Sequence, residues 1–534
     1  MRSAPTWPRP PGSDHDVRAQ LMANVTRAAA LVTALTALST VLGLGRDVVI
    51  AGVFGATAAL DAYFVAQGLM NVVLGLVAGA MARAAVPVAA REAAAEGKQC
   101  ASHRSIDVAL SVTLVVLGLA TLLMWLGAGA VVTALAPGFD GAQAELARDL
   151  TRVVLLATVL IAGTNLLAAL AQAHGRFGWA GVQGVPFNLV MIVAAAGFGP
   201  RYGVTALAGG FVVGSAVRLL LQLVPLRAIG ARLRPSFALS DPGFREIARL
   251  VPALLVGSAV GNVNTLVDRA VGSTLADGTI SALGYAWRMV SLGETLLVAS
   301  LLTALYPALG AASADLPRLQ GLVSRGLAVT AVVLTPVSAV LVCAAHPAVT
   351  VLFGRGSFDA DDAAMTATAV LWYAPALLAL GWREVVTRAS YAVGDSSGPV
   401  VVAIGAMVIN VVGDLTLGRI YGIAGLAAST SLSLLVAAAA NTWLLGRRHR
   451  VVGVASTGPL LARALLLGTL ATLVGLATGR AVGVGSADDV TTALGHGTLI
   501  GAVVLVVYAL GLIAVRAPEG RAFWGSVRQL LSRS

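Results

Sequence analysis

Long apolar segments recur along the whole chain and are separated by short polar ones. A helix needs about 20 apolar residues to cross the roughly 30 Å hydrocarbon layer of a membrane. We predict fourteen such helices, near residues 27–53, 62–88, 107–135, 150–172, 180–198, 204–226, 246–272, 279–308, 325–346, 366–390, 399–418, 422–445, 459–479 and 497–515. These segments are rich in Ala, Leu, Val and Gly without alternation of apolar and polar residues, which favours helices over strands. The pattern therefore predicts an all-α polytopic membrane protein.

The composition agrees with this interpretation. Of the 534 residues, 57% are hydrophobic and 11% are charged, and the mean hydropathy is +0.86. Soluble globular proteins contain about 25% charged residues. A chain with so few charges cannot cover a surface that faces water, so a soluble protein is excluded.

Basic residues mark one side of the predicted bundle. With the N-terminus placed in the cytoplasm, the inner segments contain Arg91, Lys98, Arg104, Arg176, Arg227, Arg232, Arg234, Arg245, Arg318, Arg325, Arg447, Arg448, Arg450, Arg516, Arg521, Arg528 and Arg533. The opposite loops mix a few arginines with several aspartates. This asymmetry predicts that both termini are cytoplasmic. The net charge of +11 is thus mainly a topology signal, and arginines scattered over short loops argue against nucleic acid as a partner.

The chain also contains an internal repeat. The segment "RDVVIAGVFGATAALDAYFVA" has a counterpart about 220 residues later in "DRAVGSTLADGTISALGYAWR", and "ALAPGFD" (134–140) recurs as "LFGRGSFD" (352–359). Each unit contains six predicted helices. Because six is even, the two units share one orientation and are expected to be related by a pseudo-two-fold axis along the membrane normal.

The repeat defines the predicted domains. Residues 1–26 are expected to form a disordered cytoplasmic tail, 27–228 an N-lobe of helices 1–6, and 229–245 a cytoplasmic linker. Residues 246–446 would form a C-lobe of helices 7–12, residues 447–515 two additional helices, and 516–534 a cytoplasmic tail.

Ionisable residues within the apolar segments are the candidate functional groups, because a charge near the bilayer centre costs roughly 2.5–3.5 kcal/mol and usually faces a cavity or a partner. The doublets Arg46–Asp47 and Asp268–Arg269 and the single Asp61 stand out. The doublets either cap helices and pair across the halves, with Asp47 and Asp268 as structural partners, or face a cavity. Adjacent helical residues point about 100° apart, so both members of a doublet are not expected to face one cavity.

Other charged residues divide into two groups. Arg218, Arg383 and Arg388 lie near predicted cytoplasmic helix ends, where snorkelling explains them. Arg288 and Glu294 lie deeper, and their spacing of six residues gives no intrahelical pair, so a cavity role is favoured. Guanidinium groups in a pocket of low dielectric constant are suited to phosphate or pyrophosphate, which predicts an anionic cargo. Asparagines on the helices, such as Asn188 and Asn410, are expected to link helices.

Catalytic chemistry has little support. The six histidines are dispersed without ligand spacing, and no nucleotide-binding motif is present, so we expect no cofactor and no metal. The acidic segment "FDADDAAM" (358–365) is interpreted as a helix N-cap. A glycosyltransferase or ligase would need a sizeable loop or domain outside the bilayer, and the longest outer loops, near 347–364 and 480–496, are short.

Several motifs in order along residues 27–445 resemble the MurJ/MviN family of flippases for lipid-linked peptidoglycan precursors. They are "GLGRDVVIAGVFGATAALDAYFVA", "AVPVAAREAAAEGK", "LADGTISALGYAWRM", "VLFGRGSFDADDAAMTATAV" and "ASYAVGDSSGPVVVAIGAMVINVV". The resemblance implies a V-shaped bundle of two lobes around a cationic cavity in a bacterial cytoplasmic membrane. It also implies a groove for the polyprenyl tail along helices 13 and 14, and alternating access driven by an ion or the membrane potential. Cell-wall synthesis enzymes are candidate partners.

The resemblance assigns roles residue by residue. Arg46 matches the arginine of the family's "RD", Asp61 the aspartate that opens the second helix, and Arg288 the cavity arginine of "YADR"; Arg269 and Glu294 complete our substrate-binding set. The chain departs from the family at positions that usually carry charge, namely Thr40, Leu74, Gly75, Gly79, Trp287 and Ser291. A flippase for lipid II is the favoured function. A flippase for another lipid-linked glycan and an ion-coupled small-molecule exporter are the alternatives.

Overall fold

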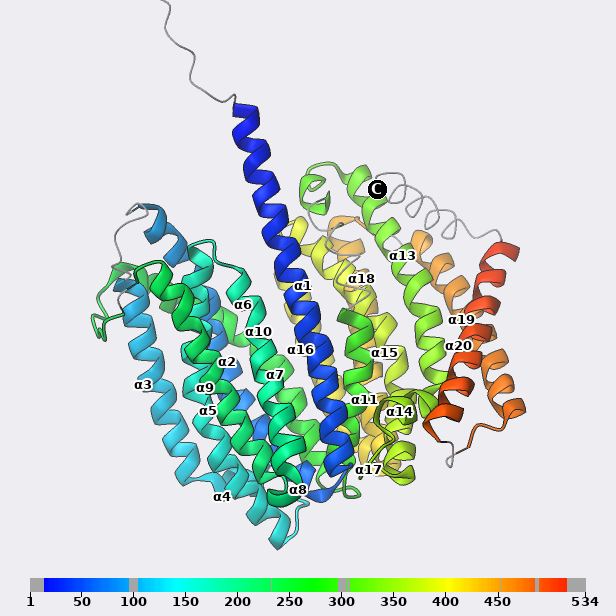
Figure 1. The fold of residues 1–534 in the computed structure, drawn as a ribbon. Coiled ribbons are helices and arrows are strands. Elements are labelled where there is room, and N and C mark those ends of the chain that lie inside the picture. Colours follow the sequence, from blue (N-terminus) through cyan, green and yellow to red (C-terminus); the bar gives the residue numbers. More distant parts are fainter. Residues whose placement is uncertain are drawn as a thin grey trace, which may run out of the picture.

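The computed structural model describes residues 14–95, 104–231, 233–295, 305, 308–452, 454–485 and 489–515. Throughout this described part, every regular element is a helix, as the sequence predicts, and the helices lie side by side in one bundle (Figure 1). The all-α fold is therefore confirmed.

The helices of the first half are α1 (Asp14–Phe54), α2 (Ala58–Ala95), α3 (Arg104–Leu126), α4 (Ala128–Leu135), α5 (Gly141–Ala173), α6 (Gly178–Val182), α7 (Gly184–Val193), η1 (Ala194–Phe198), α8 (Gly199–Tyr202) and α9 (Thr205–Ala228). The later helices are α10 (Pro242–Gly272), α11 (Thr279–Gly293), α13 (Leu316–Cys343), α14 (Ala345–Phe353), α15 (Ala360–Ala392), α16 (Ser397–Gly413), η3 (Asp414–Gly418), α17 (Arg419–Tyr421), α18 (Ile423–His449), α19 (Val454–Val482) and α20 (Val490–Ala514). The short elements η1 and η3 are π-helical turns.

Eleven helical segments among the described residues are long and apolar enough to cross a membrane. Each coincides with one of the fourteen predicted spans. The other three predicted spans, 62–88, 246–272 and 279–308, fall on α2, α10 and α11. Each of these spans contains residues whose side chains or placement the structure does not describe, so the number fourteen stays a prediction. The predicted span 107–135 is two helices, because the chain leaves helical geometry at Gly127 between α3 and α4.

The order of elements repeats. In the first half, a long helix, a short helix and a second long helix (α3, α4 and α5) are followed by a helix that the π-turn η1 interrupts (α7–η1–α8) and then by α9. The second half has the same order. Its elements are α13, α14 and α15, then α16–η3–α17, and then α18. Details match as well, since the side chains of Asp140 and Asp359 cap α5 and α15. Gly203 and Gly422, with φ of 59° and 60°, follow the two interrupted helices. These correspondences support the internal repeat.

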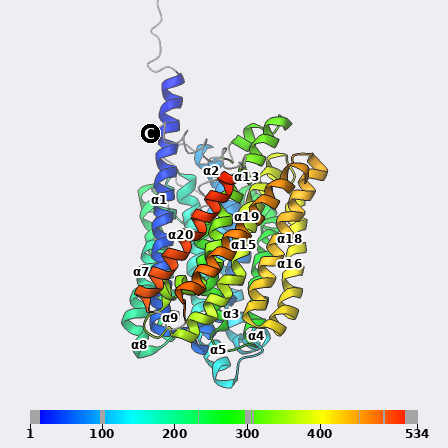
Figure 2. The ribbon, with the colours of Figure 1, turned by 90° about the vertical axis from the view of Figure 1, so that its right-hand side faces the viewer.

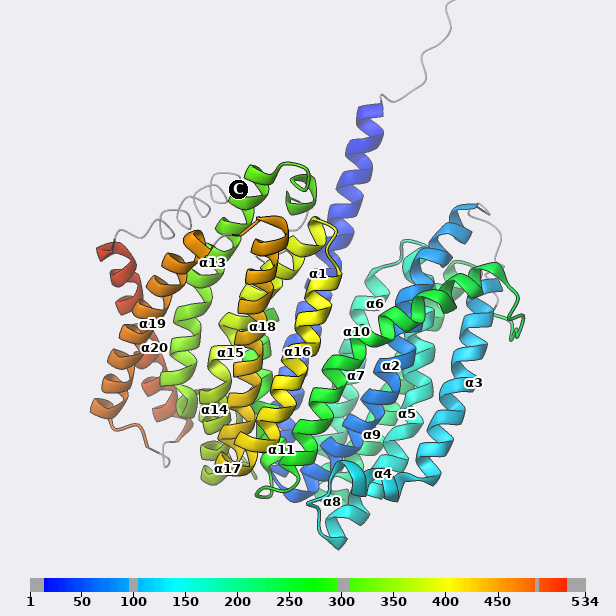
Figure 3. The same cartoon turned by 180° about the vertical axis from the view of Figure 1, so that it is seen from behind.

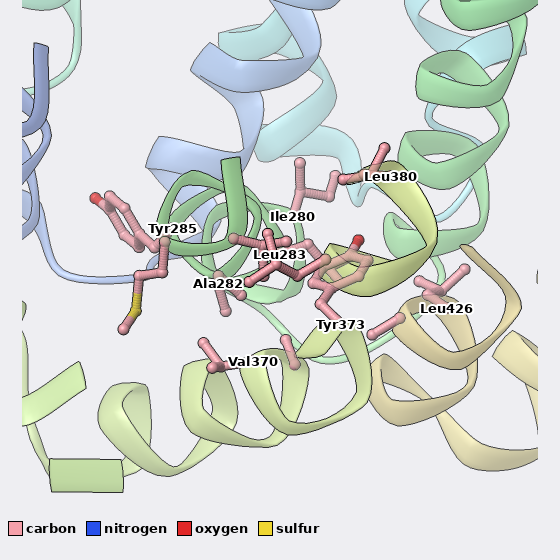
Figure 4. Packing of buried hydrophobic residues seen from close by; sticks show 14 of the residues in the cluster. Ile280, Ala282, Leu283, Tyr285, Val370, Tyr373, Leu380 and Leu426 are labelled. Carbon is pink, nitrogen blue, oxygen red and sulfur yellow. The ribbon is translucent and has the colours of Figure 1, made fainter. Parts of the chain in front are cut away.

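The bundle has two ends that matter for the site. We call the end where α1 begins the N-terminal face and the end with residues 55–57, 136–140 and 354–359 the junction face. Figure 3 shows α2, α3, α5 and α9 on one side of the bundle and α13, α15 and α18 on the other, with α10 and α16 between them. Within the second half, Leu283 and Tyr285 of α11 pack near Val370 and Tyr373 of α15 (Figure 4).

Helix α10 contacts both halves. Near its start, Phe244 and Ile247 share one buried cluster with Met81 of α2 and Ile106 of α3. Near its end, Val271 packs against the second half beside Gly418. The predicted boundary at residue 246 therefore falls within α10, the helix that contacts both halves. The domain limits stay a prediction.

The last two helices pack together and against α13 (Figure 2). Leu467 of α19 and Ile500, Val504 and Tyr508 of α20 form a buried cluster with Ala339 of α13. Apolar packing of this kind places the described parts of α19 and α20 against the second half, outside the repeat.

Candidate functional site

A cavity of about 400 Å³ lies between the two repeats. Helices α1, α6, α7 and α9 of the first half form one wall, and α11 of the second half forms the other. The polar and charged residues that line it are Thr36, Ser39, Thr40, Gln183, Asn188, Arg218, Arg288, Ser291 and Thr295. Among the described residues, its lining contains two guanidinium groups and no carboxyl group. The cavity is therefore polar and basic.

One carboxylate joins two arginines at the wall of this cavity. Asp47 Oδ1 accepts hydrogen bonds from Arg46 Nε at 2.9 Å and from Arg46 Nη2 at 2.7 Å. Asp47 Oδ2 accepts from Arg288 Nε at 2.6 Å. Because Arg46 and Asp47 lie on α1 and Arg288 lies on α11, this ion triad connects the two repeats. The prediction that Asp47 is an ion-pair partner is supported by these contacts, but its partners include the residue next to it.

Asparagine and glycine fix the position of the triad. Arg46 Nη1 donates to Asn188 Oδ1 at 3.1 Å, and Asn188 Nδ2 donates to the carbonyl oxygen of Ser39 at 2.9 Å. A Cβ atom on Gly43 would lie 3.2 Å from Arg288 Nη2, so the absence of a side chain lets this guanidinium lie close to α1. The side chain of Arg46 is 18% exposed and that of Arg288 is 35% exposed, so Arg288 is the more available of the two for a ligand.

Arg218 also lines the cavity, which corrects our interpretation of this residue as a snorkelling side chain. Its guanidinium carbon lies 5.3 Å from the centre of the Phe187 ring, and both residues face the cavity. Position along the helix suggested snorkelling, but the direction of the side chain around the helix decides whether an arginine reaches the interface or the cavity.

Asp61 lies elsewhere, in a contact between the repeats at the junction face. Its Oδ1 accepts from the backbone nitrogen of Ser281 at 2.7 Å and from Ser281 Oγ at 2.6 Å. These donors lie in the first turn of α11, where backbone N–H groups have no partner within the helix. Asp61 therefore stabilises the junction, and a direct role in substrate binding stays a prediction.

Further hydrogen bonds join the halves at the junction face. The backbone nitrogen of Ala56 donates to Asp362 Oδ2 at 2.9 Å, and the nitrogen of Ser357 donates to the carbonyl oxygen of Gly52 at 2.8 Å. Asp359 caps α15 by accepting from the nitrogen of Asp362, which supports the helix-cap interpretation of the acidic segment. The junction face is thus closed by hydrogen bonds from backbone N–H groups to carboxylates and to one backbone carbonyl of the other half.

The second doublet and Glu294 do not line the cavity. Arg269 lies against Gly68 of α2, where any Cβ atom would meet the guanidinium at 1.3 Å. Asp268 lies in hydrogen-bonding contact with Asp414 of η3. The charged neighbours of Glu294 include Arg383 and Glu384 of α15.

The pair Asp268–Asp414 belongs to a buried polar cluster. Asn410 Nδ2 donates to Asp414 Oδ1 at 3.2 Å and to Ser429 Oγ at 3.1 Å, and Ser429 Oγ donates to Asp414. Oδ1 of Asp268 and Oδ2 of Asp414 are buried without a hydrogen-bond partner among the described residues. Two carboxyl groups in contact cannot both be ionised unless a cation lies between them. This cluster can therefore hold a proton or a small cation.

The described positions that depart from the family pattern lie in different environments. Thr40 and Ser291 line the cavity. Their hydroxyl groups donate to the carbonyl oxygens of Thr36 and Arg288, at 2.9 and 3.0 Å. Trp287 packs edge-on against Tyr373 in the apolar core. Leu74 and Gly75 belong to the residues whose side chains the structure does not describe.

A helical bundle with an internal repeat, spans of membrane length and a basic cavity between the repeats defines a membrane transporter. The family model described as "Lipid II flippase MurJ" matches residues 50–485. A lipid II flippase MurJ from Burkholderia cenocepacia is 32% identical over 467 residues, which cover 85% of this chain and 89% of the relative. A probable lipid II flippase MurJ from Vibrio cholerae is 32% identical over 438 residues, covering 79% and 82%. The chain belongs to the lipid II flippase MurJ family, and it is a multi-pass membrane transporter rather than an enzyme.

Solved structures agree on the fold. A structure of "Lipid II flippase MurJ, inward closed conformation" superposes with a TM-score of 0.76 at 21% identity, covering 91% of this chain and 99% of the other. An inward-facing multidrug transporter of the MATE family superposes with a TM-score of 0.63 at 16% identity, covering 77% and 94%. The fold is therefore shared across a wider group of transporters.

Proposed function

We propose that the protein moves lipid II, a peptidoglycan precursor linked to a polyprenyl pyrophosphate, from the inner to the outer leaflet of a bacterial cytoplasmic membrane. The observation that carries this proposal is the triad Arg46–Asp47–Arg288, which connects the two repeats beside a basic cavity. Guanidinium groups bind phosphate oxygens through parallel charge-assisted hydrogen bonds. Membership in the flippase family supports the same cargo.

The triad suggests how cargo and conformation are connected. In the structure, Asp47 occupies one donor of Arg288, the Nε–H group, that a phosphate could use. A pyrophosphate that enters the cavity competes with Asp47 for Arg288, and this exchange loosens the bridge between α1 and α11. Arg46 keeps Asp47 and Asn188 as partners, so it holds the carboxylate in place while Arg288 changes partner.

We assign the N-terminal face to the cytoplasm, as the distribution of arginines predicts. The cavity then lies on the cytoplasmic side of the contacts that close the junction face. The headgroup would enter from the inner leaflet, and the junction hydrogen bonds would break for its release on the outer side. The polyprenyl tail would remain in the apolar layer along α19 and α20, and cell-wall synthesis enzymes remain candidate partners.

The buried pair Asp268–Asp414 is our candidate for coupling to an ion. It lies where α10, which contacts both halves, meets η3 of the second half. Uptake of a proton or a monovalent cation by this pair removes the repulsion between two carboxylates. Asp414→Asn would remove the dependence of transport on the ion gradient if this assignment holds.

Complementation tests the proposal. The protein is expressed in bacteria whose own lipid II flippase can be switched off, and growth is measured after depletion. We expect growth with the parent chain and none with Arg288→Ala at equal membrane abundance. Arg201→Ala, which alters an arginine stacked on Tyr202 at the junction face, is the control that should grow.

Absence of growth with a stable parent chain would contradict lipid II as the cargo. The alternatives are then a different lipid-linked glycan or an ion-coupled small-molecule exporter. Leaflet assays on other polyprenyl-linked glycans would distinguish them, because only the first alternative predicts a lipid that accumulates in the inner leaflet when the protein is depleted.

A further inference from the structure

Arg218 of α9 is a cation at the cavity that, unlike Arg46 and Arg288, has no carboxylate partner among the described residues. No described carboxylate forms a salt bridge with it, and its buried Nε atom has no hydrogen-bond partner in the described part of the chain. The electrostatic contact that it does make is with the face of the Phe187 ring, at 5.3 Å. An ionised group taken out of water without a partner is costly. An unpaired guanidinium in a cavity therefore points to an anion that comes from outside.

The stacking on Phe187 orients the group for binding. A guanidinium that lies over an aromatic face keeps its N–H donors free at its planar edge. Because Phe187 and Arg218 both line the cavity, this edge borders the same space as Arg288. Gln183 also lines the cavity, and its buried Oε1 atom has no hydrogen-bond partner among the described residues. An anion that also carries hydroxyl groups offers an acceptor to the Arg218 guanidinium and a donor to the Gln183 amide.

The charges at the cavity indicate which anion fits. Arg46, Arg288 and Arg218 contribute three positive charges, and Asp47 contributes one negative charge, which leaves a formal charge of +2. A sugar joined to a lipid through a pyrophosphate diester carries two negative charges. The same sugar joined through a monophosphate diester carries one. Without Arg218 the cavity would have a formal charge of +1, which matches the monophosphate.

We propose that Arg218 is a third cargo-binding cation and that it sets the preference for pyrophosphate-linked over monophosphate-linked polyprenyl carriers. This inference rests on the proposed function, because it takes a polyprenyl-linked glycan as the cargo. Arg288, released from Asp47, binds one phosphate, and Arg218 on the opposite wall binds the other. A monophosphate diester has a single charged group, so it leaves one of the two guanidinium groups without an anionic partner.

The test is a binding measurement on the full-length protein in lipid nanodiscs. Two synthetic lipids serve as probes; they carry the same sugar and the same polyprenyl chain and differ only in a pyrophosphate or monophosphate linkage. We compare the parent chain with Arg218→Gln and Arg218→Lys. Arg201→Gln is the matched control, because Arg201 also stacks on an aromatic ring, at 5.6 Å from Tyr202, but lies away from the cavity.

The expected result is selective. Hydrogen bonds to charged groups contribute enough that Arg218→Gln should weaken binding of the pyrophosphate lipid about tenfold to a hundredfold, with a change of less than about threefold for the monophosphate lipid. Arg218→Lys keeps the charge but loses the planar fork, so it should show a smaller loss with the same selectivity. It also keeps the test valid if Arg218→Gln fails to fold, as judged by its thermal unfolding.

Three outcomes would decide against the inference. Equal weakening of both lipids by Arg218→Gln shows a general role, and unchanged binding of the pyrophosphate lipid shows no role. An effect of Arg201→Gln as large as that of Arg218→Gln shows that stacked arginines act through stability. A parent chain that binds neither lipid contradicts the proposed function itself, and this result is distinct from the other three.

Discussion

The junction face offers a test of alternating access, because glycines hold the two repeats in backbone contact there. A Cβ atom on Gly356 would lie 2.1 Å from the carbonyl oxygen of Gly52, on the other half. Ordinary contacts of Cβ atoms begin at about 3.4 Å, so Gly356→Ala requires the two backbones to separate by about 1.3 Å. The hydrogen bond from Ser357 to Gly52, 2.8 Å long, would be lost as well.

The expected shift follows from these contacts. Overpacking of this kind costs about 1–3 kcal/mol. Because the clash exists only when the junction is closed, it destabilises the closed form and lowers the ratio of closed to open forms by roughly 5- to 150-fold. Alanine at the positive φ of 64° adds backbone strain that is present in both forms. Gly422→Ala supplies the control, because Gly422 has φ of 60° and a Cβ atom added there would meet no other atom within 4 Å.

Spin labels at Thr57 and Asp361, on opposite sides of the junction, report the separation in a background without Cys100 and Cys343. Pulsed electron spin resonance should show a longer distance distribution for Gly356→Ala and the parent distribution for Gly422→Ala. If Gly356→Ala keeps the parent distribution, or if both variants lengthen it equally, then backbone contact at these glycines does not control closure of the junction.

Three further changes probe other parts of the fold. Gly68→Ala places a Cβ atom on the guanidinium of Arg269, so we expect the protein to lose about 1–3 kcal/mol of stability and to unfold at a lower temperature. Gly79→Ala, on the same helix, is the control that should leave the unfolding temperature unchanged, because a Cβ atom there meets no atom within 4 Å. Ser281→Ala removes one of two hydrogen bonds to the buried Asp61 and should cost about 1–3 kcal/mol; an unchanged unfolding temperature would contradict its role at the junction. Asp395 lies in the loop before α16. Hydrogen bonds hold the pKa of its carboxyl group well below its usual range; the strongest comes from the backbone N–H group of Gly398, and weaker ones come from the side chains of Ser397, His449 and Arg448. A lowered pKa stabilises the fold above the unfolded pKa of about 3.9, so Asp395→Asn should lower the unfolding temperature at pH 7. The difference should stay nearly constant down to about pH 4 and shrink as the pH falls further; a difference that grows as the pH falls would refute it.

Much of the fold follows from local patterns. The apolar segments predict the spans, because crossing a hydrocarbon layer depends on the length and hydropathy of one segment. The caps at Asp140 and Asp359 are also local, since each side chain bonds to a backbone group three residues away. The repeat was visible in sequence because the same loops and caps recur at one spacing.

The site could be predicted only in part. The arginine chemistry indicated an anionic cargo, and Arg288 does line the cavity. The roles of Arg218, Arg269 and Asp61 depend on neighbours that are distant in sequence, namely Phe187, Gly68 and Ser281. Asn188 is expected to link helices, and its bonds to α1 agree, but its contact with Arg46 could not be inferred from its position.

The sequence by itself determined that this chain lies in a membrane and which residue types carry charge there. Only the tertiary structure decided which charges meet. Asp47 joins Arg46 to Arg288, whereas Asp268 meets Asp414, although both aspartates occur in similar doublets. The physical reason is that hydropathy belongs to a segment, while the partner of a buried ion depends on the rotation of its helix and on which helix lies opposite.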